Sequence, residues 1–421
     1  MTLTRYEIHQ ARPRLVEFTA QMLDGLPRKD QRAKGELYVR GLLTDGRRKS
    51  MQPMAERLGV DHQQFQQFIT SSTWDCTQVR RNVATWAVPV VEPVAYAVDD
   101  TGLPKDGDAS PCVAHQYCGR LGKTTNCQVA VSIQMVTDTA SLAVDWRLFC
   151  PKSWDDRELD DPAEAEAARR RREKAKLPDE ARHREKWRLA LDMLDEATGV
   201  WGLPKLPVAA DCGYGDVTAF RLGLEDRGLD YAVAVSSTLS AHPADAVPTA
   251  PPYSGRGRPP VPKYQDKPAT LGELALAAGE GACQQVTWRQ GTRKSRDNPD
   301  AEMRSRFLAL PVRPANRDIP RADDGSLPLK TLLAEWPEGA DKPTDFWLSN
   351  LPADTPPPAL VHLAKIRWRV EHDYRELKTG LGLGHFEGRT HAGWNRHATL
   401  VCLAQAFCTL LRLDPKAPAP A

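Results

Sequence analysis

The chain has 421 residues, which is enough for two or three domains and a sizeable hydrophobic core. Its formal net charge of +2 and isoelectric point near 8.0 do not by themselves indicate a nucleic-acid-binding protein, so the distribution of charge matters more than its sum. Nine cysteines without a Cys-x-x-Cys pair, and no apolar run near the ~20 residues of a membrane span, exclude a disulfide scaffold and an integral membrane protein. We expect a cytoplasmic protein.

The first 90 residues are expected to form a separate helical domain. One helix is predicted to begin near Gln52, where Pro53 suits a first helical turn, and a second covers residues 62–70 with Asp61 as its N-cap. Two helices joined by a short turn have the outline of a helix-turn-helix, although helix pairs without DNA contacts are common. The candidate DNA contacts here are Arg47, Arg48, Lys49, Gln63 and Gln67.

Two short apolar runs in the first half of the chain end in acids. Residues 94–100 end in Asp99 and Asp100, and residues 206–211 end in Asp211. Such runs predict buried strands, and acids at strand ends lie at the edge of a sheet, where active sites of α/β proteins gather. Further elements are predicted as strands over 126–138, 141–151 and 230–236, and as a helix over 217–227.

A basic segment joins the predicted strand 141–151 to the strand that ends in Asp211. Residues 164–188 contain a dense run of arginines and lysines beside the expected site. We interpret the run as a grip on backbone phosphates, with an exposed, ion-paired helix as the alternative. The candidate contacts are Arg169, Arg170, Arg171 and Arg172.

Residues 237–350 are rich in proline and glycine and are expected to form a β-rich insertion. Three strands are predicted within it, over 284–295, 306–313 and 345–352. The tail 413–421 is expected to be disordered.

The segment 365–378 places one acid among regularly spaced bases on an expected helix. A period of 3.6 residues puts Arg367, Glu371, Arg375 and Lys378 on one face, beside an apolar stripe through Val370. That face suits a carboxylate that binds a metal and cations that bind phosphates. Simple ion pairs between residues four apart are the alternative.

The order of these elements and the three acids resemble the ribonuclease-H-like core of DDE transposases. The resemblance is greatest to bacterial transposases of the insertion-sequence-four superfamily, particularly its seven-hundred-one branch, and runs from about residue 38 to 411. That superfamily has a tyrosine–arginine–glutamate–lysine helix motif, which Arg367, Glu371 and Lys378 match, whereas Ala364 stands where the tyrosine is expected. The segments DDTG, ADCGYGD and YRELKTGLGLGHFEGR also resemble recurrent segments of the branch.

The resemblance implies catalysis by Asp100, Asp211 and Glu371, which would bind Mg²⁺, with Mn²⁺ as a substitute. Two such ions can stabilise the attacking and leaving oxygens of a phosphodiester displacement, and carboxylates are the ligands they prefer. Asp100 is favoured as the first acid because the family places it directly before a threonine, here Thr101. Because adjacent strand residues face opposite ways, only one of the two acids can point into the site. Asp99 would then support Asp100 without binding the metal or cap a turn, or it would be the first ligand in place of Asp100.

The fold expected from the resemblance is an α/β ribonuclease-H-like core with a mixed five-stranded sheet and flanking helices, formed by residues 91–236 and 351–412. The expected function is a transposase that cuts and joins the ends of an insertion sequence. Its partners would be double-stranded DNA, as terminal inverted repeats and target, and a second copy of the chain on DNA in the bacterial nucleoid. The alternatives are a domesticated DNA-binding regulator and a stand-alone Mg²⁺-dependent nuclease.

Overall fold

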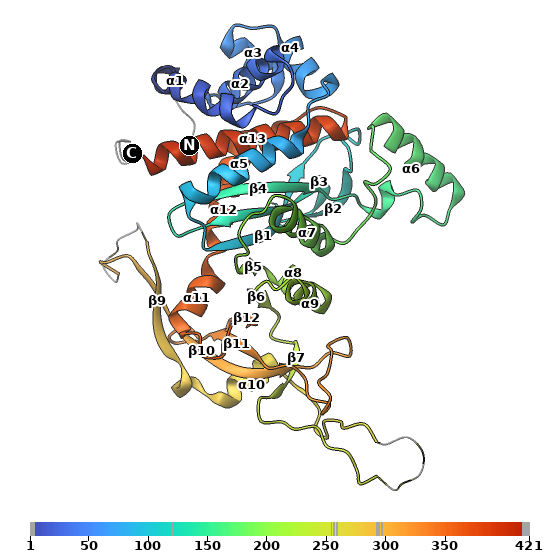
Figure 1. Ribbon diagram of the computed structural model, residues 1–421, viewed down its shortest axis with the longest axis vertical. Helices are drawn as coiled ribbons and strands as arrows, with labels where there is room; N and C mark the ends of the chain where they lie inside the picture. The colour runs from blue at the N-terminus through green and yellow to red at the C-terminus, as the bar shows by residue number, and fades with distance from the viewer. Residues whose placement is uncertain are drawn as a thin grey trace. The chain divides into compact units, whose positions relative to one another are not determined.

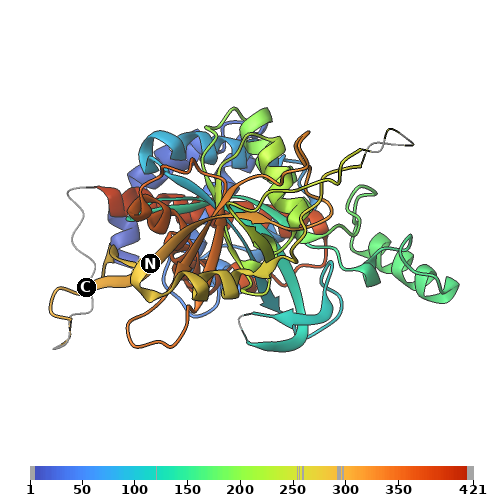
Figure 2. The same cartoon turned by 90° about the horizontal axis from the view of Figure 1, so that it is seen from below.

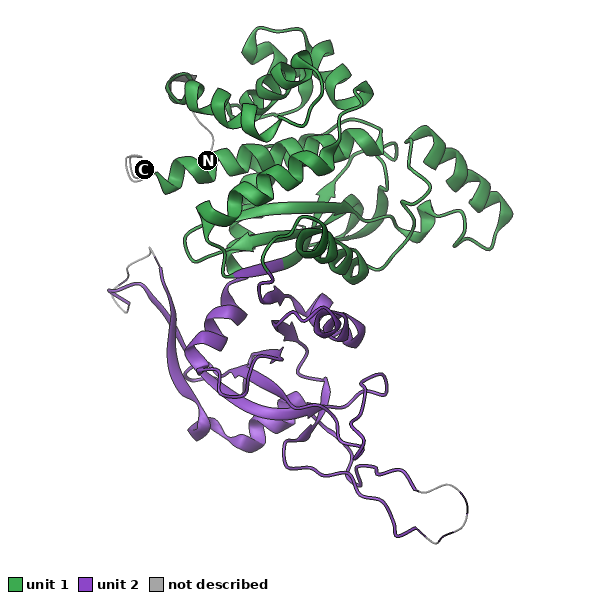
Figure 3. Cartoon of the chain, viewed as in Figure 1, with its two compact units in different colours: residues 1–94, 98–204, 368–421 green, residues 95–97, 205–367 purple. Residues whose placement is uncertain are grey.

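The computed structural model describes residues 5–119, 121–253, 255, 257, 260–291, 295 and 298–414. The chain divides into two compact units (Figure 3). Unit 1 contains residues 1–94, 98–204 and 368–421, and unit 2 contains residues 95–97 and 205–367. Unit 1 therefore joins the N-terminal helices to the first strands and the last helices, so these boundaries differ from the expected domains. The expected tail lies outside the described residues from residue 415 onward.

Unit 1 begins with helices (Figure 1). These are α1 (Arg5–Met22), α2 (Lys29–Leu43), α3 (Met51–Leu58), α4 (His62–Gln66) with the π-helical turn η1 (Gln67–Ser71), and α5 (Cys76–Val91). Both predicted helices of the pair are present. Gly59 ends α3 with a left-handed φ of 68°, which glycine adopts without steric cost, and the Asp61 side chain accepts a hydrogen bond from the Gln63 N–H at 2.9 Å.

The sheet of unit 1 contains most of β1 (Ala95–Pro104) together with β2 (Ala114–Cys118), β3 (Lys123–Val136) and β4 (Ser141–Leu148). The strand order is β2-β3-β1. The first part of β3 pairs antiparallel with β2 and the second part pairs antiparallel with β4. The long β3 is buried from Cys127 to Val136, as expected for a strand covered on both faces.

The remaining elements of unit 1 lie after β4 and at the end of the chain. They are η2 (Lys152–Trp154), α6 (Pro162–Lys174), α7 (Lys186–Asp195), η3 (Glu196–Val200), α12 (Trp368–Arg375), η5 (Glu376–Gly380), η6 (Leu383–His385) and α13 (His391–Leu413). Helix α6 stands clear of the sheet of unit 1 in both views (Figures 1 and 2). No helix within the described ranges combines the length and hydrophobicity needed to cross a bilayer.

Helix α13 is the centre of unit 1. It packs on α1, α2, α5 and β4, and its residues from Gly393 to Thr409 are almost all buried. Its polar residues are satisfied by distant parts of the chain. His397 bonds to the Tyr38 hydroxyl at 2.8 Å through Nδ1 and to the Gly382 carbonyl at 3.0 Å through Nε2. The N-terminal helices α1, α2 and α5 and the strand β4 thus pack on the same helix, α13.

A buried arginine fixes α5 to this core. Arg80 donates to Asp145 Oδ1 and the Trp146 carbonyl of β4, both at 2.9 Å, and to Thr399 Oγ1 of α13 at 2.8 Å. Arg80 is 5% exposed and Asp145 is fully buried. A buried ion pair of this kind needs hydrogen bonds on both partners to offset desolvation, and here both partners have them.

Unit 2 holds the rest of the chain, including the first three residues of β1. Its elements are β5 (Val208–Ala210), α8 (Cys212–Gly215), α9 (Thr218–Asp226), β6 (Tyr231–Val235), β7 (Ser240–Pro243), β8 (Ala269–Thr270), α10 (Leu271–Ala278), η4 (Glu280–Ala282), β9 (Gln284–Gln290), β10 (Glu302–Pro314), β11 (Lys330–Glu335), β12 (Asp345–Ser349) and α11 (Pro357–Lys365). Beside the start of β1, Tyr96 N–H donates to the Pro207 carbonyl at 2.8 Å.

The strands of the expected insertion continue the sheet of unit 2. The order is β5-β6-β12-β11-β10-β7-β8, with β9 also paired to β10. Strands β5 and β6 are parallel, and β12 then pairs antiparallel with β6. Five strands therefore do not describe the arrangement, because the edge of β6 that would end the core sheet is occupied by β12. Strand β11, which the sequence analysis missed, lies between β10 and β12.

Candidate active site

The first candidate acids lie side by side on β1 in unit 1 and have different surroundings. The prediction that they end the strand is wrong, because β1 continues to Pro104. Asp99 is 8% exposed and its Oδ1 accepts the Asp100 N–H at 2.7 Å. The Asp100 side chain is 25% exposed, and its Oδ2 accepts a hydrogen bond from Lys186 Nζ at 3.0 Å. The alternation of a strand thus turns one carboxylate inward and the other outward.

Lys186 is a site residue that the sequence analysis did not single out from the basic run. It begins α7, its side chain is 38% exposed, and its ammonium also lies 5.9 Å from the centre of the Phe149 ring. A cation therefore already stands against the Asp100 carboxylate. This pairing could not be predicted from local sequence patterns, because Lys186 and Asp100 are 86 positions apart.

Asp211 lies in unit 2 at the place predicted for it, directly after β5. It is the N-cap residue of α8, and its carbonyl accepts the Gly215 N–H at 2.8 Å. The following glycines allow this tight strand-to-helix turn. A Cβ on Gly215 would lie 1.9 Å from the Ala234 carbonyl oxygen, so only glycine lets α8 approach β6 this closely.

Arg367 belongs to the same unit as Asp211. The pKa of the neighbouring Cys212 thiol is raised by burial and by the carboxylates of Asp211 and Asp216, and the Arg367 guanidinium opposes that rise. Arg367 therefore lies within electrostatic range of the turn that carries Asp211. This places a cation near a candidate acid.

The expected continuous helix over 365–378 is wrong. The chain turns at Ile366 and Arg367, so that α11 ends at Lys365 and α12 begins at Trp368. After Arg375 the helix widens into the π-helical turn η5. Both changes depart from the period of 3.6 residues on which the prediction of a single charged face rested.

The side chains of this segment differ in their exposure. Glu371 and Arg375 are exposed on α12 in unit 1. Lys378 is only 8% exposed, and its ammonium lies 5.3 Å from the centre of the Tyr374 ring. The predicted apolar stripe is present, since Val370 and Leu377 are fully buried. Lys378 is therefore placed for packing rather than on the surface beside Glu371.

Two of the predicted DNA contacts are buried. Lys49 is fully buried, and its ammonium donates to the carbonyls of Leu42, at 2.9 Å, and Thr44. Arg172 is 5% exposed and donates to the carbonyls of Trp154, Pro178 and Ala181 at 3.2, 3.0 and 2.8 Å. Each side chain donates to backbone carbonyls in the interior, so the prediction that Lys49 and Arg172 contact DNA is not supported.

The other basic and polar candidates are on the surface. Arg169 and Arg170 are exposed, and both lie near Glu166, at 2.5 and 3.9 Å. Arg171 packs over the Trp154 ring at 5.4 Å. Exposed side chains are also found at Arg47, Arg48, Gln63 and Gln67. Arg169 and Arg170 thus make surface ion pairs, which are weak contacts, as the ion-paired alternative expects.

The three acids are distributed over both units, with Asp100 and Glu371 in unit 1 and Asp211 in unit 2. Considering only residues whose placement is described, no three histidine, cysteine or acidic side chains form a group that could hold a metal ion. The donor set is nevertheless suited to Mg²⁺ or Mn²⁺, because three carboxylates offer hard oxygen ligands and no thiolate or imidazole competes within the set.

Comparison with known sequences decides the family. The sequence model described as "DDE superfamily endonuclease" matches residues 21–295, which is well over half of the chain. The chain belongs to the DDE superfamily of endonucleases. The matched region includes Asp100 and Asp211 and ends before Glu371. The family implies a ribonuclease-H-like fold, and the observed mixed sheet with flanking helices agrees with it.

The chain is also similar to a protein described as a "Probable transposase for insertion sequence element IS701" from Microchaete diplosiphon. The two are 31% identical over 115 residues, which is 27% of this chain and 30% of the relative. The similarity therefore spans less than a third of the relative's length. It agrees with the branch that the sequence motifs indicated.

Proposed function

We propose that this DDE endonuclease is a DNA transposase that cuts and joins the ends of an insertion sequence. The observation that carries the proposal is the family match over residues 21–295, which includes Asp100 within the buried strand β1 and Asp211 directly after the buried strand β5. The similarity to a probable transposase supports the same activity. The substrates are the terminal inverted repeats and a target duplex, and the chain acts as a homodimer on DNA.

Asp100, Asp211 and Glu371 are the proposed ligands of Mg²⁺, which Mn²⁺ can replace. When bound, the metal stabilises the charge that develops on the attacking and leaving oxygens at phosphorus. Asp99 positions its neighbour, since its carboxylate accepts the Asp100 N–H. Arg367 and Arg375 contribute positive charge toward the phosphates of the substrate.

The remaining parts of the chain are assigned to DNA binding and to shaping of the site. Residues 1–90 bind the terminal repeats, with Gln63 and Gln67 on the exposed face of the second helix of the pair. Residues 91–236 and 351–412 form the catalytic core, and the insertion 237–350 contacts the DNA ends. The exposed arginines at 169–171 follow the DNA backbone.

Cleavage of a labelled duplex that carries the sequence flanking the gene tests this function. Asp100→Ala, Asp211→Ala and Glu371→Ala should each abolish Mg²⁺-dependent cleavage and leave DNA binding in place. Asp179→Ala is the matched control, because its side chain is 73% exposed and pairs only with Arg157 and Arg182 among the described contacts. Cleavage that survives in Asp100→Ala but not in Asp99→Ala would move the first ligand by one residue.

Two other outcomes would replace the proposal. DNA binding without cleavage by the wild-type protein would indicate a domesticated regulator. Cleavage of branched or arbitrary DNA without joining of ends would indicate a stand-alone nuclease.

A further inference from the structure

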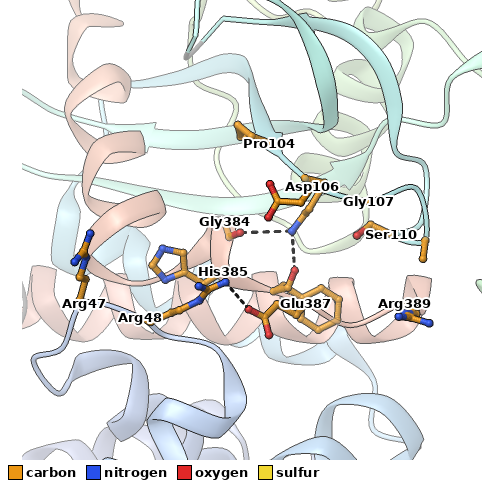
Figure 4. A pocket seen from close by; sticks show the side chains of 13 residues that line it. Arg47, Arg48, Pro104, Asp106, Gly107, Ser110, Gly384, His385, Glu387 and Arg389 are labelled. Carbon is orange, nitrogen blue, oxygen red and sulfur yellow. Dashed lines mark hydrogen bonds and ion pairs between the residues drawn. The ribbon is translucent and has the colours of Figure 1, made fainter.

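A cavity of about 750 Å³ opens in unit 1 and is lined by none of the three acids assigned to catalysis (Figure 4). Three segments that are distant in sequence form its walls. They are the basic turn after α2, the end of β1 with the loop that follows it, and residues 384–389 before α13. All three belong to the same compact unit.

The walls of the cavity are positively charged. Four basic side chains against two acidic ones leave a net charge of +2 when the histidine is neutral. The basic residues are Arg47, Arg48, Lys105 and Arg389, and the acidic residues are Asp106 and Glu387. Such a wall attracts an anion, and guanidinium groups suit phosphate oxygens in particular.

The side chains of Lys105 and His385 are held in place to donate hydrogen bonds into the cavity. Lys105 Nζ donates to the carbonyls of Phe386 and Gly384 at 2.6 and 3.5 Å, which leaves one of its three N–H groups for a ligand. His385 Nδ1 accepts the Lys49 N–H at 3.1 Å, so a neutral His385 carries its proton on Nε2. The backbone N–H of the buried Lys49 thus fixes the orientation of the His385 ring in the cavity wall.

The arginines remain available for exchange. Arg48 pairs with Glu387 at 2.9 Å, but their side chains are 67% and 57% exposed, and pairs this exposed contribute little. A phosphate can therefore replace the carboxylate at small cost. Arg47 and Arg389 lie toward opposite sides of the cavity (Figure 4), so the positive charge is spread over its width. A run of phosphates fits this distribution better than a single phosphate does.

We propose that this cavity binds consecutive backbone phosphates of DNA beside the cleaved bond, and this inference rests on the proposed function. Lys105 follows Asp100 by five residues at the end of β1, which corresponds to about 17 Å of extended chain. Phosphates follow one another by about 3.4 Å of helix axis along one strand, so one duplex reaches both the carboxylate and the cavity within about five base pairs.

The salt dependence of DNA binding tests the proposal without any cleavage. The protein is titrated with a fluorescent random-sequence duplex in EDTA over a series of salt concentrations. The double variant Arg47→Gln/Arg389→Gln should lose about 1.8 units of the slope of log K against log salt, since each lost phosphate contact removes about 0.9. Both side chains are exposed, so the variant should retain the wild-type melting temperature.

Lys152→Gln is the control. Its side chain is 67% exposed, as that of Arg48 is, and it pairs with Glu158 at 3.9 Å outside the cavity. This variant should change the slope of log K against log salt by less than about 0.9, which is the contribution of one phosphate contact. An unchanged slope in the double variant, or an equal loss in the control, would overturn the proposal.

A calorimetric titration with pyrophosphate separates DNA from a free anion. Tight binding of pyrophosphate that the double variant loses, together with an unchanged DNA slope, would assign the cavity to a small phosphate ligand and overturn the DNA proposal. Failure of the proposed function is distinguishable, because it would appear as absent cleavage by the wild-type protein while the slope still depends on Arg47 and Arg389.

Discussion

The ion pair between Lys186 and Asp100 predicts a competition between an ammonium and a metal ion. A carboxylate whose Oδ2 lies 3.0 Å from Lys186 Nζ must give up part of that contact when it binds Mg²⁺. Lys186→Met removes the competitor and leaves the Asp100 carboxylate unchanged. The variant should therefore bind metal more tightly than the wild-type protein.

The exposure of the two side chains limits the size of this effect. At 38% and 25% exposure, the pair is screened by water, and exposed pairs contribute at most about 1 kcal/mol. That free energy corresponds to about a fivefold decrease in the dissociation constant of the metal. Lys186→Arg, which keeps a cation at this position, should change the constant by much less.

Binding of Mn²⁺ can be followed by the electron paramagnetic resonance signal of the free ion, independently of activity. Cleavage measured against Mg²⁺ concentration should show the same shift toward lower concentration. Weaker Mn²⁺ binding by Lys186→Met would refute the competition, and would mean that the ammonium supports the metal site or the substrate.

Two further predictions concern the stability of unit 1. Arg80→Met leaves the buried Asp145 without one of its cations and should lower the free energy of unfolding by about 3–5 kcal/mol. Arg157→Met removes an exposed pair with Asp179 and should lower it by no more than about 1 kcal/mol. Urea denaturation followed by tryptophan fluorescence compares the two variants, and equal losses would contradict the buried-pair argument. Burial lowers the pKa of Lys49 to about 8, so between about pH 8 and its ordinary value of 10.5 the unfolded chain binds more protons and stability rises with pH. Lys49→Met should reduce that rise in urea midpoints measured at about pH 7.5 and 9.5, and a rise equal to that of the wild-type protein would exclude Lys49 as its source.

Local sequence patterns predicted the elements that local forces determine. The apolar runs before Asp100 and Asp211 form β1 and β5, and Asp61 caps its helix as expected. In each case the necessary information lies within a few residues, because burial, strand alternation and capping are properties of neighbouring positions.

The errors arose where distant residues determine the outcome. A period of 3.6 residues cannot predict the turn at Arg367 or the π-helical turn after Arg375, and each changes which side chains share a face. Lys49 and Arg172 were assigned to the surface because they are charged, yet backbone carbonyls within unit 1 satisfy them in the interior. The pairing of Lys186 with Asp100 likewise depends on the folded chain alone.

The central position of α13 sets the order in which the protein can be completed during synthesis. The N-terminal helices and the strands of unit 1 leave the ribosome first, but α13, which packs between them, is made only after unit 2. All of unit 2 from residue 205 to 367 is synthesised in between. Domains generally fold as units while the chain emerges, yet unit 1 can close only after its final segment is released. A ribosome that stops after unit 2 therefore produces a chain with an open, apolar unit 1, which chaperones and proteases recognise as unfolded.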